Sequence, residues 1–281
     1  MAETLYLVFG DLHGRILPAF RLAAAWARDH DCRIDGLLQV GDLGYFPDVS
    51  QLDKATRRHA ADDPLELGAL CVAEPSQEAD RVFAEECVPE ALWFTAGNHE
   101  DHAFLQSLAH GDVFMVDAYQ RVRCIRDGHI AHLPGGLRVG ALWGIDGQAA
   151  VRRRHAPSHC LIQAESALRL ACSTFDVLLT HDSPLDAIIP NAGSQDILDI
   201  IQAARPAFAF FGHHKGCGHQ VEGDFGAAQV YHLAGMELRE SRHRAEEGSV
   251  GVLRWDGVCG SFTYVNPAWL RTFTRYNWRS R

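Results

Sequence analysis

The chain has 281 residues, of which 47% are hydrophobic and 22% are charged, a composition that excludes disordered, collagen-like and coiled-coil proteins. Its formal net charge of -10 provides no general basic surface for nucleic acid or for anionic membranes. A chain of this length is compatible with one large α/β domain.

The N-terminal sequence MAETLYLVFGD has no basic residue before its apolar stretch, so it predicts a strand rather than a signal peptide. No apolar run approaches the ~20 residues that cross a bilayer. The eight cysteines are scattered without a CxxC pair, which indicates reduced thiols. These features predict a cytoplasmic location without a membrane partner.

The first half of the chain alternates between apolar runs and helical periodicity. The expected elements, in chain order, are a strand at 4–9, a helix at 19–29, a strand at 36–40, a helix at 78–88, a strand at 92–95 and a helix at 103–109. Between them, residues 46–76 contain turn signals and many acids, and we interpret this stretch as an inserted excursion. Because it leaves directly from a GD turn, we expect it to shape access to a cleft.

The second half continues the alternation. The expected elements are two strands around a Pro-Gly-Gly turn within 129–141, helices at 158–171 and 195–204, and strands at 177–180, 208–211, 229–233, 250–255 and 261–265. The chain contains no internal repeat or clean linker. This pattern predicts one α/β domain over 1–281, built from two packed mixed sheets with helices outside and a C-terminal strap at 267–281.

Five polar clusters each follow a predicted strand. They are GDLHGR at 10–15, GDLGYF at 41–46, GNHED at 97–101, THDSP at 180–184 and GHHKG at 212–216. Strand ends of α/β sheets gather ligand sites, so all five clusters are expected to meet in one cleft. Asp, Asn and His are costly to bury unless they are paired or bound to metal.

The residue types in these clusters suit two metal ions. Asp11 and His13 are two residues apart and point to the same side of an extended strand end. The carboxylate of Asp42 can bridge two cations, and further ligands of suitable chemistry are Asn98, His181 and His213. Two adjacent cations can activate water and bind a phosphoryl oxygen. The ions are divalent or trivalent, with manganese favoured and iron, zinc or nickel chemically acceptable.

In this order the motifs DxH, GD, GNHE, TH and GH resemble the calcineurin-like metallophosphoesterase superfamily over residues 10–216. The resemblance implies an αββα sandwich. It also implies that the first metal is bound by Asp11, His13 and Asp42, and the second by Asp42, Asn98, His181 and His213. His99 corresponds to the histidine that protonates the leaving group or holds the phosphate.

The chain departs from the family pattern at GHxH, because Lys215 stands where the last histidine completes the first metal site. His214, His219 or His232 could replace that histidine. The protein Ser/Thr phosphatase branch also lacks it, but its GDxVDRG motif is absent here. A small zinc site made by residues 213–219 is a weaker alternative, since its spacing lacks a second half.

Several basic residues are candidate substrate contacts. Arg15 either binds a phosphate or lies on the solvated surface, and Lys215 and His214 are further candidates. The run Arg152, Arg153, Arg154 and His155, with His159 nearby, either recognises a polyphosphate or nucleic-acid backbone or forms a solvated face.

The leading hypothesis is a dinuclear metal-dependent hydrolase that acts on phosphomonoesters, either a phosphoprotein or a small phosphorylated metabolite. Attack is expected from a metal-bound hydroxide, since no P-loop, dinucleotide fingerprint or GxSxG elbow is present. The alternatives are a phosphodiesterase, a nucleotide pyrophosphohydrolase or a catalytically silent metal-binding scaffold. The presence of Asp42, Asn98 and His99 argues against the scaffold.

Overall fold

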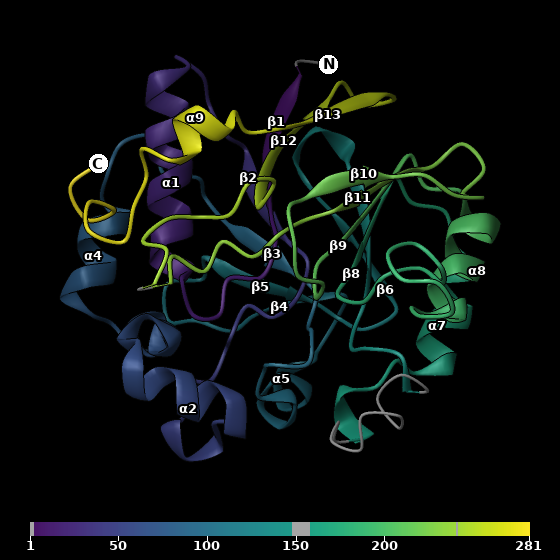
Figure 1. Ribbon diagram of the computed structural model, residues 1–281, viewed down its shortest axis with the longest axis horizontal. Coiled ribbons are helices and arrows are strands. Elements are labelled where there is room, and N and C mark those ends of the chain that lie inside the picture. Colours follow the sequence, from purple (N-terminus) through teal and green to yellow (C-terminus); the bar gives the residue numbers. More distant parts are fainter. Residues whose placement is uncertain (1–2, 148–157, 240) are drawn as a thin grey trace.

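Two mixed β-sheets pack face to face, and helices cover their outer sides (Figure 1). This computed structural model describes residues 3–147, 158–239 and 241–281. The α/β class and the pair of mixed sheets predicted from the sequence are therefore confirmed.

The first sheet has parallel strands at its centre and antiparallel strands toward both edges. Its order is β13 (Gly260–Tyr264), β12 (Val250–Trp255), β1 (Thr4–Phe9), β2 (Gly36–Gln39), β3 (Leu92–Phe94), β5 (Val122–Ile125) and β4 (Val113–Met115). The second sheet follows the same plan. Its order is β10 (His219–Val221), β11 (Gln229–His232), β9 (Phe208–Phe211), β8 (Val177–Thr180), β7 (Arg138–Leu142) and β6 (His129–His132).

Strand β1 shows why these apolar runs form a two-layer core. Successive side chains of a strand point to opposite faces. Leu7 and Phe9 accordingly pack outward against the helical layer. Tyr6 and Val8 pack inward between the two sheets. Both faces of the central strands are covered, which explains their nearly continuous hydrophobic sequences.

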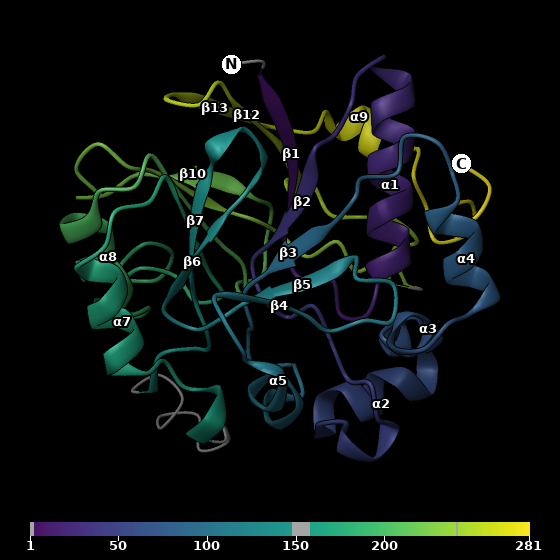
Figure 2. The same cartoon turned by 180° about the vertical axis from the view of Figure 1, so that it is seen from behind.

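Helices flank the two sheets on opposite sides of the molecule, as the front and back views show (Figures 1 and 2). Beside the first sheet lie α1 (Ile16–Asp29) and α4 (Gln77–Phe83), and beside the second lie α7 (Ala164–Ala171) and α8 (Gln195–Ala204). The shorter helices are α2 (Lys54–Asp62), α3 (Leu70–Ala73), α5 (His102–Leu108) and α9 (Pro267–Leu270). Among the described helices, none combines the length and the apolar character needed to span a membrane.

The excursion at 46–76 is largely helical and packs on the GDLHGR turn. Arg15 of that turn is fully buried, and its guanidinium lies 2.7 Å from Asp63 and 2.7 Å from Glu66. Gly14 has a φ of +86°, and a Cβ there would lie 2.4 Å from the carbonyl oxygen of Leu65. Only glycine permits this backbone approach, so the excursion is fitted closely to the turn.

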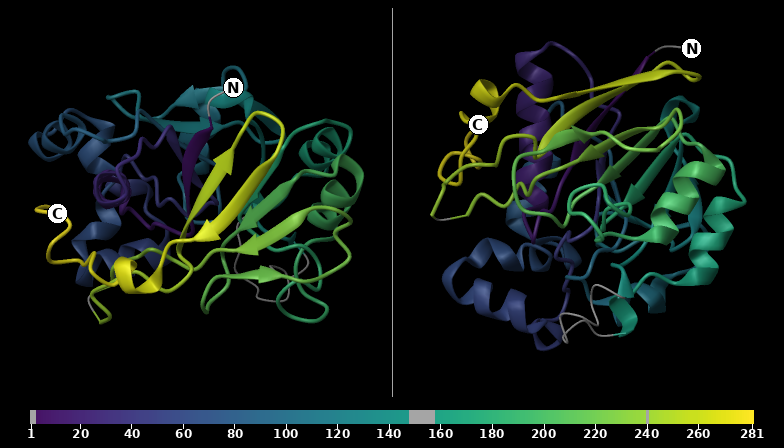
Figure 3. Two further views of the ribbon diagram at one scale, coloured as in Figure 1. Left: turned by 90° about the horizontal axis from the view of Figure 1, so that it is seen from above. Right: turned by 45° about the vertical axis from the view of Figure 1, so that its right-hand side comes forward.

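The C-terminal segment lies along α1 as a strap (Figure 3). Phe273 and Trp278 are buried in the helical layer. The Arg21 side chain of α1 donates a hydrogen bond to the carbonyl oxygen of Trp278 at 3.1 Å. This packing explains why nearly every residue of α1 is buried.

Some predicted boundaries were wrong. The helix expected at 78–88 ends at Phe83, before Cys87 adopts a φ of +66°. The helix expected at 158–171 is a 3-10 turn at Ser158–Cys160 followed by α7. The sequence interpretation also missed β4, β5 and β10, which are only three or four residues long.

Candidate metal centre

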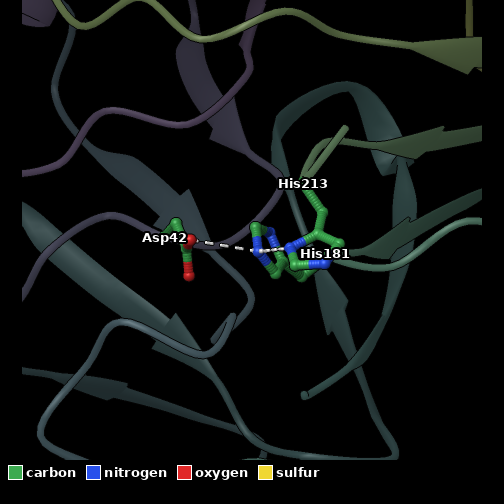
Figure 4. Close-up of side chains that lie close together, drawn as sticks. All are labelled: Asp42, His181 and His213. Carbon is green, nitrogen blue, oxygen red and sulfur yellow. Dashed lines mark hydrogen bonds and ion pairs between the residues drawn. The ribbon is translucent and has the colours of Figure 1, made fainter. Parts of the chain in front are cut away.

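The six predicted metal ligands lie after the ends of five parallel strands, three from the first sheet and two from the second. Five of these side chains, all except that of Asn98, form two groups in which the ligand atoms lie within 4.8 Å of one another. One group contains Asp11, His13 and Asp42, and the other contains Asp42, His181 and His213, drawn in Figure 4. Asp42 is common to both groups.

The two oxygens of Asp42 have different surroundings. Its Oδ1 accepts the backbone N–H groups of Asn98 and His99, each at 2.8 Å. Its Oδ2 lies 3.2 Å from Nε2 of His181 and 3.9 Å from Nε2 of His13. A Cβ on Gly97 would lie 2.3 Å from Oδ1, so the glycine of GNHE gives the carboxylate room. One oxygen is therefore fixed by the backbone while the other faces both groups.

The histidines are oriented as nitrogen ligands. Nδ1 of His181 lies 3.2 Å from the carbonyl oxygen of Val40, which can only accept, so Nδ1 carries a proton. Neutral His181 then presents the lone pair of Nε2, the form that binds metals. Nδ1 of His213 lies 3.2 Å from that same Nε2. Burial and the neighbouring His181 lower the pKa of His213 to about 4, which favours its neutral form.

The buried carboxylates of this centre favour a positive charge beside them. Asp42 is buried and the Asp11 side chain is only 13% exposed. Burial opposes a charge on His181, yet Asp42 and Asp11 raise the pKa of that imidazole to about 10. Oδ1 of Asn98 is buried without a hydrogen-bond partner among the described residues. An unpaired amide oxygen beside two carboxylates and imidazole nitrogens is a donor set that fits metal ions.

Three of these residues have unusual backbone conformations. His13, Asp42 and His213 have φ values of +40°, +53° and +65°. Left-handed conformations are uncommon for residues other than glycine and cluster at functional sites. Three of the eleven described non-glycine residues with positive φ are therefore candidate ligands.

His99 lies beside the two groups and is held by a residue of the excursion. Its Nδ1 lies 2.6 Å from Oδ2 of Asp53. The other oxygen of Asp53, Oδ1, caps α2 by accepting the backbone N–H of Thr56. Burial opposes the charged imidazole, but Asp42 and Asp53 raise the pKa of His99 to about 9. His99 and His13 line a cavity of about 130 Å³. His99 is therefore set to hold a proton next to the ligand cluster.

Glu100 joins the two loops that carry Asp42 and Asn98. Its carboxylate accepts the backbone N–H of Leu43 at 2.6 Å and that of Gly97 at 2.8 Å. Burial, followed by the charge of Asp42, raises the pKa of Glu100 to about 8. The sequence interpretation quoted this residue within GNHED without giving it a role.

Arg15 does not lie where a phosphate contact was predicted, whereas a substrate role for Lys215 stays a prediction. Arg15 is neither a surface group nor open to a ligand, because it is buried against Asp63 and Glu66. Lys215 is exposed to solvent outside the cavity beside His13. The sequence around Arg15 does not reveal its burial, because its partners Asp63 and Glu66 lie 48 and 51 residues further along the chain.

The three histidines that could replace the last GHxH histidine form a separate group. Nε2 of His214 lies 3.5 Å from Oδ1 of Asp182. The carbonyl oxygen of His214 accepts a hydrogen bond from Nε2 of His232 at 3.0 Å. His219 donates to the carbonyl oxygen of Cys217 at 3.0 Å. In the described structure none of them joins Asp11, His13 and Asp42.

Sequence reasoning missed four polar residues around the cluster: Asp53, Glu100, Glu237 and Arg239. Glu237 and Arg239 line the cavity of His13 and His99, and they follow β11, where no motif marks them. Asp53 precedes a helix as a capping residue, which is a local signal but not a functional one. The basic run at 152–155 lies outside the described residues.

No family model matches the chain, and no curated protein matches its sequence. One solved structure aligns with 94% of this chain and 100% of its own at 15% identity, with a TM-score of 0.54. The protein TT1561 of Thermus thermophilus aligns with 94% of this chain and 100% of its own at 13% identity, with a TM-score of 0.49. A predicted phosphoesterase from Streptococcus pneumoniae aligns with 95% of this chain and 91% of its own at 13% identity, with a TM-score of 0.40. At these identities the likeness concerns the fold alone.

Proposed function

We propose that the chain is a metal-dependent hydrolase of phosphate esters, because its pair of mixed sheets and its ligand motifs resemble those of calcineurin-like metallophosphoesterases. The observation that carries the proposal is the position of Oδ2 of Asp42, which faces both His13 and His181. Such an oxygen can serve two cations at once. Two bound ions would supply an activated water and neutralise charge on the phosphoryl group.

The ligands would be divided as the geometry groups them. Asp11, His13 and Asp42 would hold one ion. Asp42, His181 and His213 would hold the other, with Oδ1 of Asn98 as a further donor that has no other partner among described residues. Mixed oxygen and imidazole donors suit manganese, and iron, zinc and nickel tolerate the same set.

His99 is the proposed proton donor to the leaving group. Asp53 accepts the hydrogen bond from Nδ1, which leaves Nε2 as the nitrogen available to the substrate. Although burial opposes the charged form, the hydrogen bond and the charge of Asp53 raise the pKa of His99, which favours the protonated imidazole. A general acid must carry its proton before the bond breaks, so this state matches the role.

Phosphomonoesters are the proposed substrates, as a phosphoprotein or a small phosphorylated metabolite. The cavity of about 130 Å³ beside His13 and His99 is small and walled by the excursion, which suits a terminal phosphoryl group. A cytoplasmic location and manganese remain sequence-based expectations. A catalytically silent scaffold would not require His99 to be held by Asp53 beside the ligand cluster.

The test is an activity panel on metal-free protein to which manganese, nickel, zinc, iron or magnesium is added. The substrates are a monoester, a diester and a nucleoside polyphosphate. We expect hydrolysis of the monoester to depend on added metal and to exceed that of the others. Metal binding without hydrolysis of any ester would contradict the proposal and support the scaffold.

A further inference from the structure

The cavity next to the candidate metal centre has walls from two unrelated parts of the chain. The excursion supplies one wall, including Thr56 and His59 of α2. The segment after β11 supplies another through Glu237 and Arg239. A backbone hydrogen bond of 2.8 Å from Met236 to the carbonyl oxygen of Asp11 ties this segment to the metal-binding turn. This hydrogen bond holds the second wall next to Asp11.

Arg239 is oriented within this cavity by Glu237. Both Nε and Nη2 of Arg239 donate to the carboxylate of Glu237, the Nη2 bond being 2.7 Å long. The Glu237 side chain is 16% exposed whereas that of Arg239 is 53% exposed. Within the described residues, Nη1 of Arg239 has no hydrogen-bond partner. Glu237 therefore anchors one edge of the guanidinium and leaves other donors open to a ligand.

Arg239 is also the sole lysine or arginine among the described residues that line this cavity. Arg15 is paired with Asp63 and Glu66, and Lys215 is exposed and does not line this cavity. Within the described part of the chain, a phosphoryl group entering beside His13 and His99 would meet no other lysine or arginine that lines this cavity. Guanidinium groups match phosphate oxygens in geometry and charge.

We propose that Arg239 binds a non-bridging oxygen of the substrate phosphoryl group and that Glu237 is its positioning residue. This inference rests on the proposed phosphoesterase function and adds a determinant of substrate class. A phosphomonoester has three non-bridging oxygens and a diester has two. A hydrogen-bond donor of the protein, acting in addition to the coordination that bound ions would provide, therefore favours the monoester.

The experiment compares the parent protein with Arg239→Gln, each loaded with manganese. Steady-state rates are measured with a monoester and a diester, and inorganic phosphate binding is measured by calorimetry. Loss of a charge-assisted hydrogen bond should weaken phosphate binding by about 10-fold to 100-fold. The ratio of kcat/KM for monoester to that for diester should fall, while metal content stays unchanged.

Three further variants make the result specific. Arg239→Lys should recover part of the phosphate affinity, because it restores charge without the planar fork. Glu237→Gln should weaken phosphate binding less than Arg239→Gln and retain both metals. Arg242→Gln is the matched control, since Arg242 pairs with Glu246 and lines a different cavity. It should behave as the parent does.

Two results would overturn the inference. One is unchanged phosphate affinity in Arg239→Gln. The other is loss of a metal ion in Glu237→Gln, which would make Glu237 a ligand instead of a positioning residue. If the parent hydrolyses no ester, the proposed function fails, and phosphate calorimetry alone then decides the role of Arg239.

Discussion

The carboxylate of Asp42 is the point at which the two ligand groups meet, through its Oδ2. Asparagine at this position keeps an oxygen for the backbone N–H groups of residues 98 and 99 but removes the negative charge. Asp42→Asn should abolish turnover and lower the occupancy of both metals, as determined by elemental analysis after dialysis. Asp48→Asn, an exposed capping position, is the control. Full binding of two metals by Asp42→Asn would show that Asp42 is not a bridge.

For His99 we expect proton transfer instead of metal binding. Its imidazole contacts the carboxylate of Asp53 in the excursion and belongs to neither ligand group. His99→Ala should lower kcat by about 100-fold to 10,000-fold, the usual contribution of a general acid. Metal content should remain that of the parent. If elemental analysis instead shows that an ion is lost, His99 is a ligand and the proton-transfer role is wrong.

At the scale of elements, the excursion is attached to the metal-binding turn through buried ion pairs. Asp63 contacts both Arg15 and Arg275 of the C-terminal strap. Burial alone would raise the pKa of Asp63, but the hydrogen bond from Arg275 and the charge of Arg15 lower it below its ordinary value. Asp63 thus links three segments that are distant in the sequence.

Asp63→Asn should lower the free energy of unfolding at pH 7 by about 2–3 kcal/mol, because the buried Arg15 loses a charged partner. A carboxyl with a depressed pKa stabilises the folded state above its unfolded pKa and loses this contribution as pH falls below about 4. The difference between variant and parent should therefore shrink on acidification. Urea unfolding at several pH values measures it, and a constant difference would rule out the ionic contribution.

The strap over α1 gives a second prediction for an element. Trp278 is 1% exposed, whereas Tyr276 in the same segment is 71% exposed. Trp278→Ala should destabilise the protein by about 3–5 kcal/mol through loss of buried area and the resulting cavity. Tyr276→Ala should cost less than about 1 kcal/mol. Similar unfolding midpoints for both variants would mean that the strap contributes little to the core.

The elements that the sequence predicted well share a physical property. Strands at 4–9 and 177–180 and the helix at 195–204 were predicted with the observed boundaries, because apolar runs or helical periodicity end there at polar residues. Strands β4 and β10 were missed, and only one of the three residues in each is buried, whereas all three residues of the equally short β3, which was predicted, are buried.

The candidate ligands could be chosen from the sequence because each follows a recognisable apolar strand. The partners of Arg15 could not, since they lie 48 and 51 residues away in the excursion. Glu237 and Arg239 reach the cavity through the path of the chain after β11, and no local pattern encodes that path. Long-range packing, and not residue type, decides these positions.

For the whole molecule, the metal centre joins the two sheets. Asp42 follows a strand of the first sheet, and His181 and His213 follow strands of the second. Ions bound only by the folded state should stabilise it by about 2.7 kcal/mol at 100 times the dissociation constant. Thermal unfolding with increasing manganese should show a rising Tm in the parent but not in Asp42→Asn. An equal rise in both proteins would indicate binding elsewhere.

The separation of the ligands along the chain also affects the order in which a newly made protein becomes complete. Asp11 and the backbone of His213 are 202 residues apart but lie within hydrogen-bonding distance. Strand β1 pairs with β12, so Thr4 meets Trp255 near the other end of the chain. The first ligands are synthesised before the strands that complete the centre. The pairing of β1 with β12 can be completed only after residue 255 has been synthesised. A prematurely terminated product lacking β9 therefore carries Asp11, His13 and Asp42 without the shared metal centre. It should have no hydrolase activity.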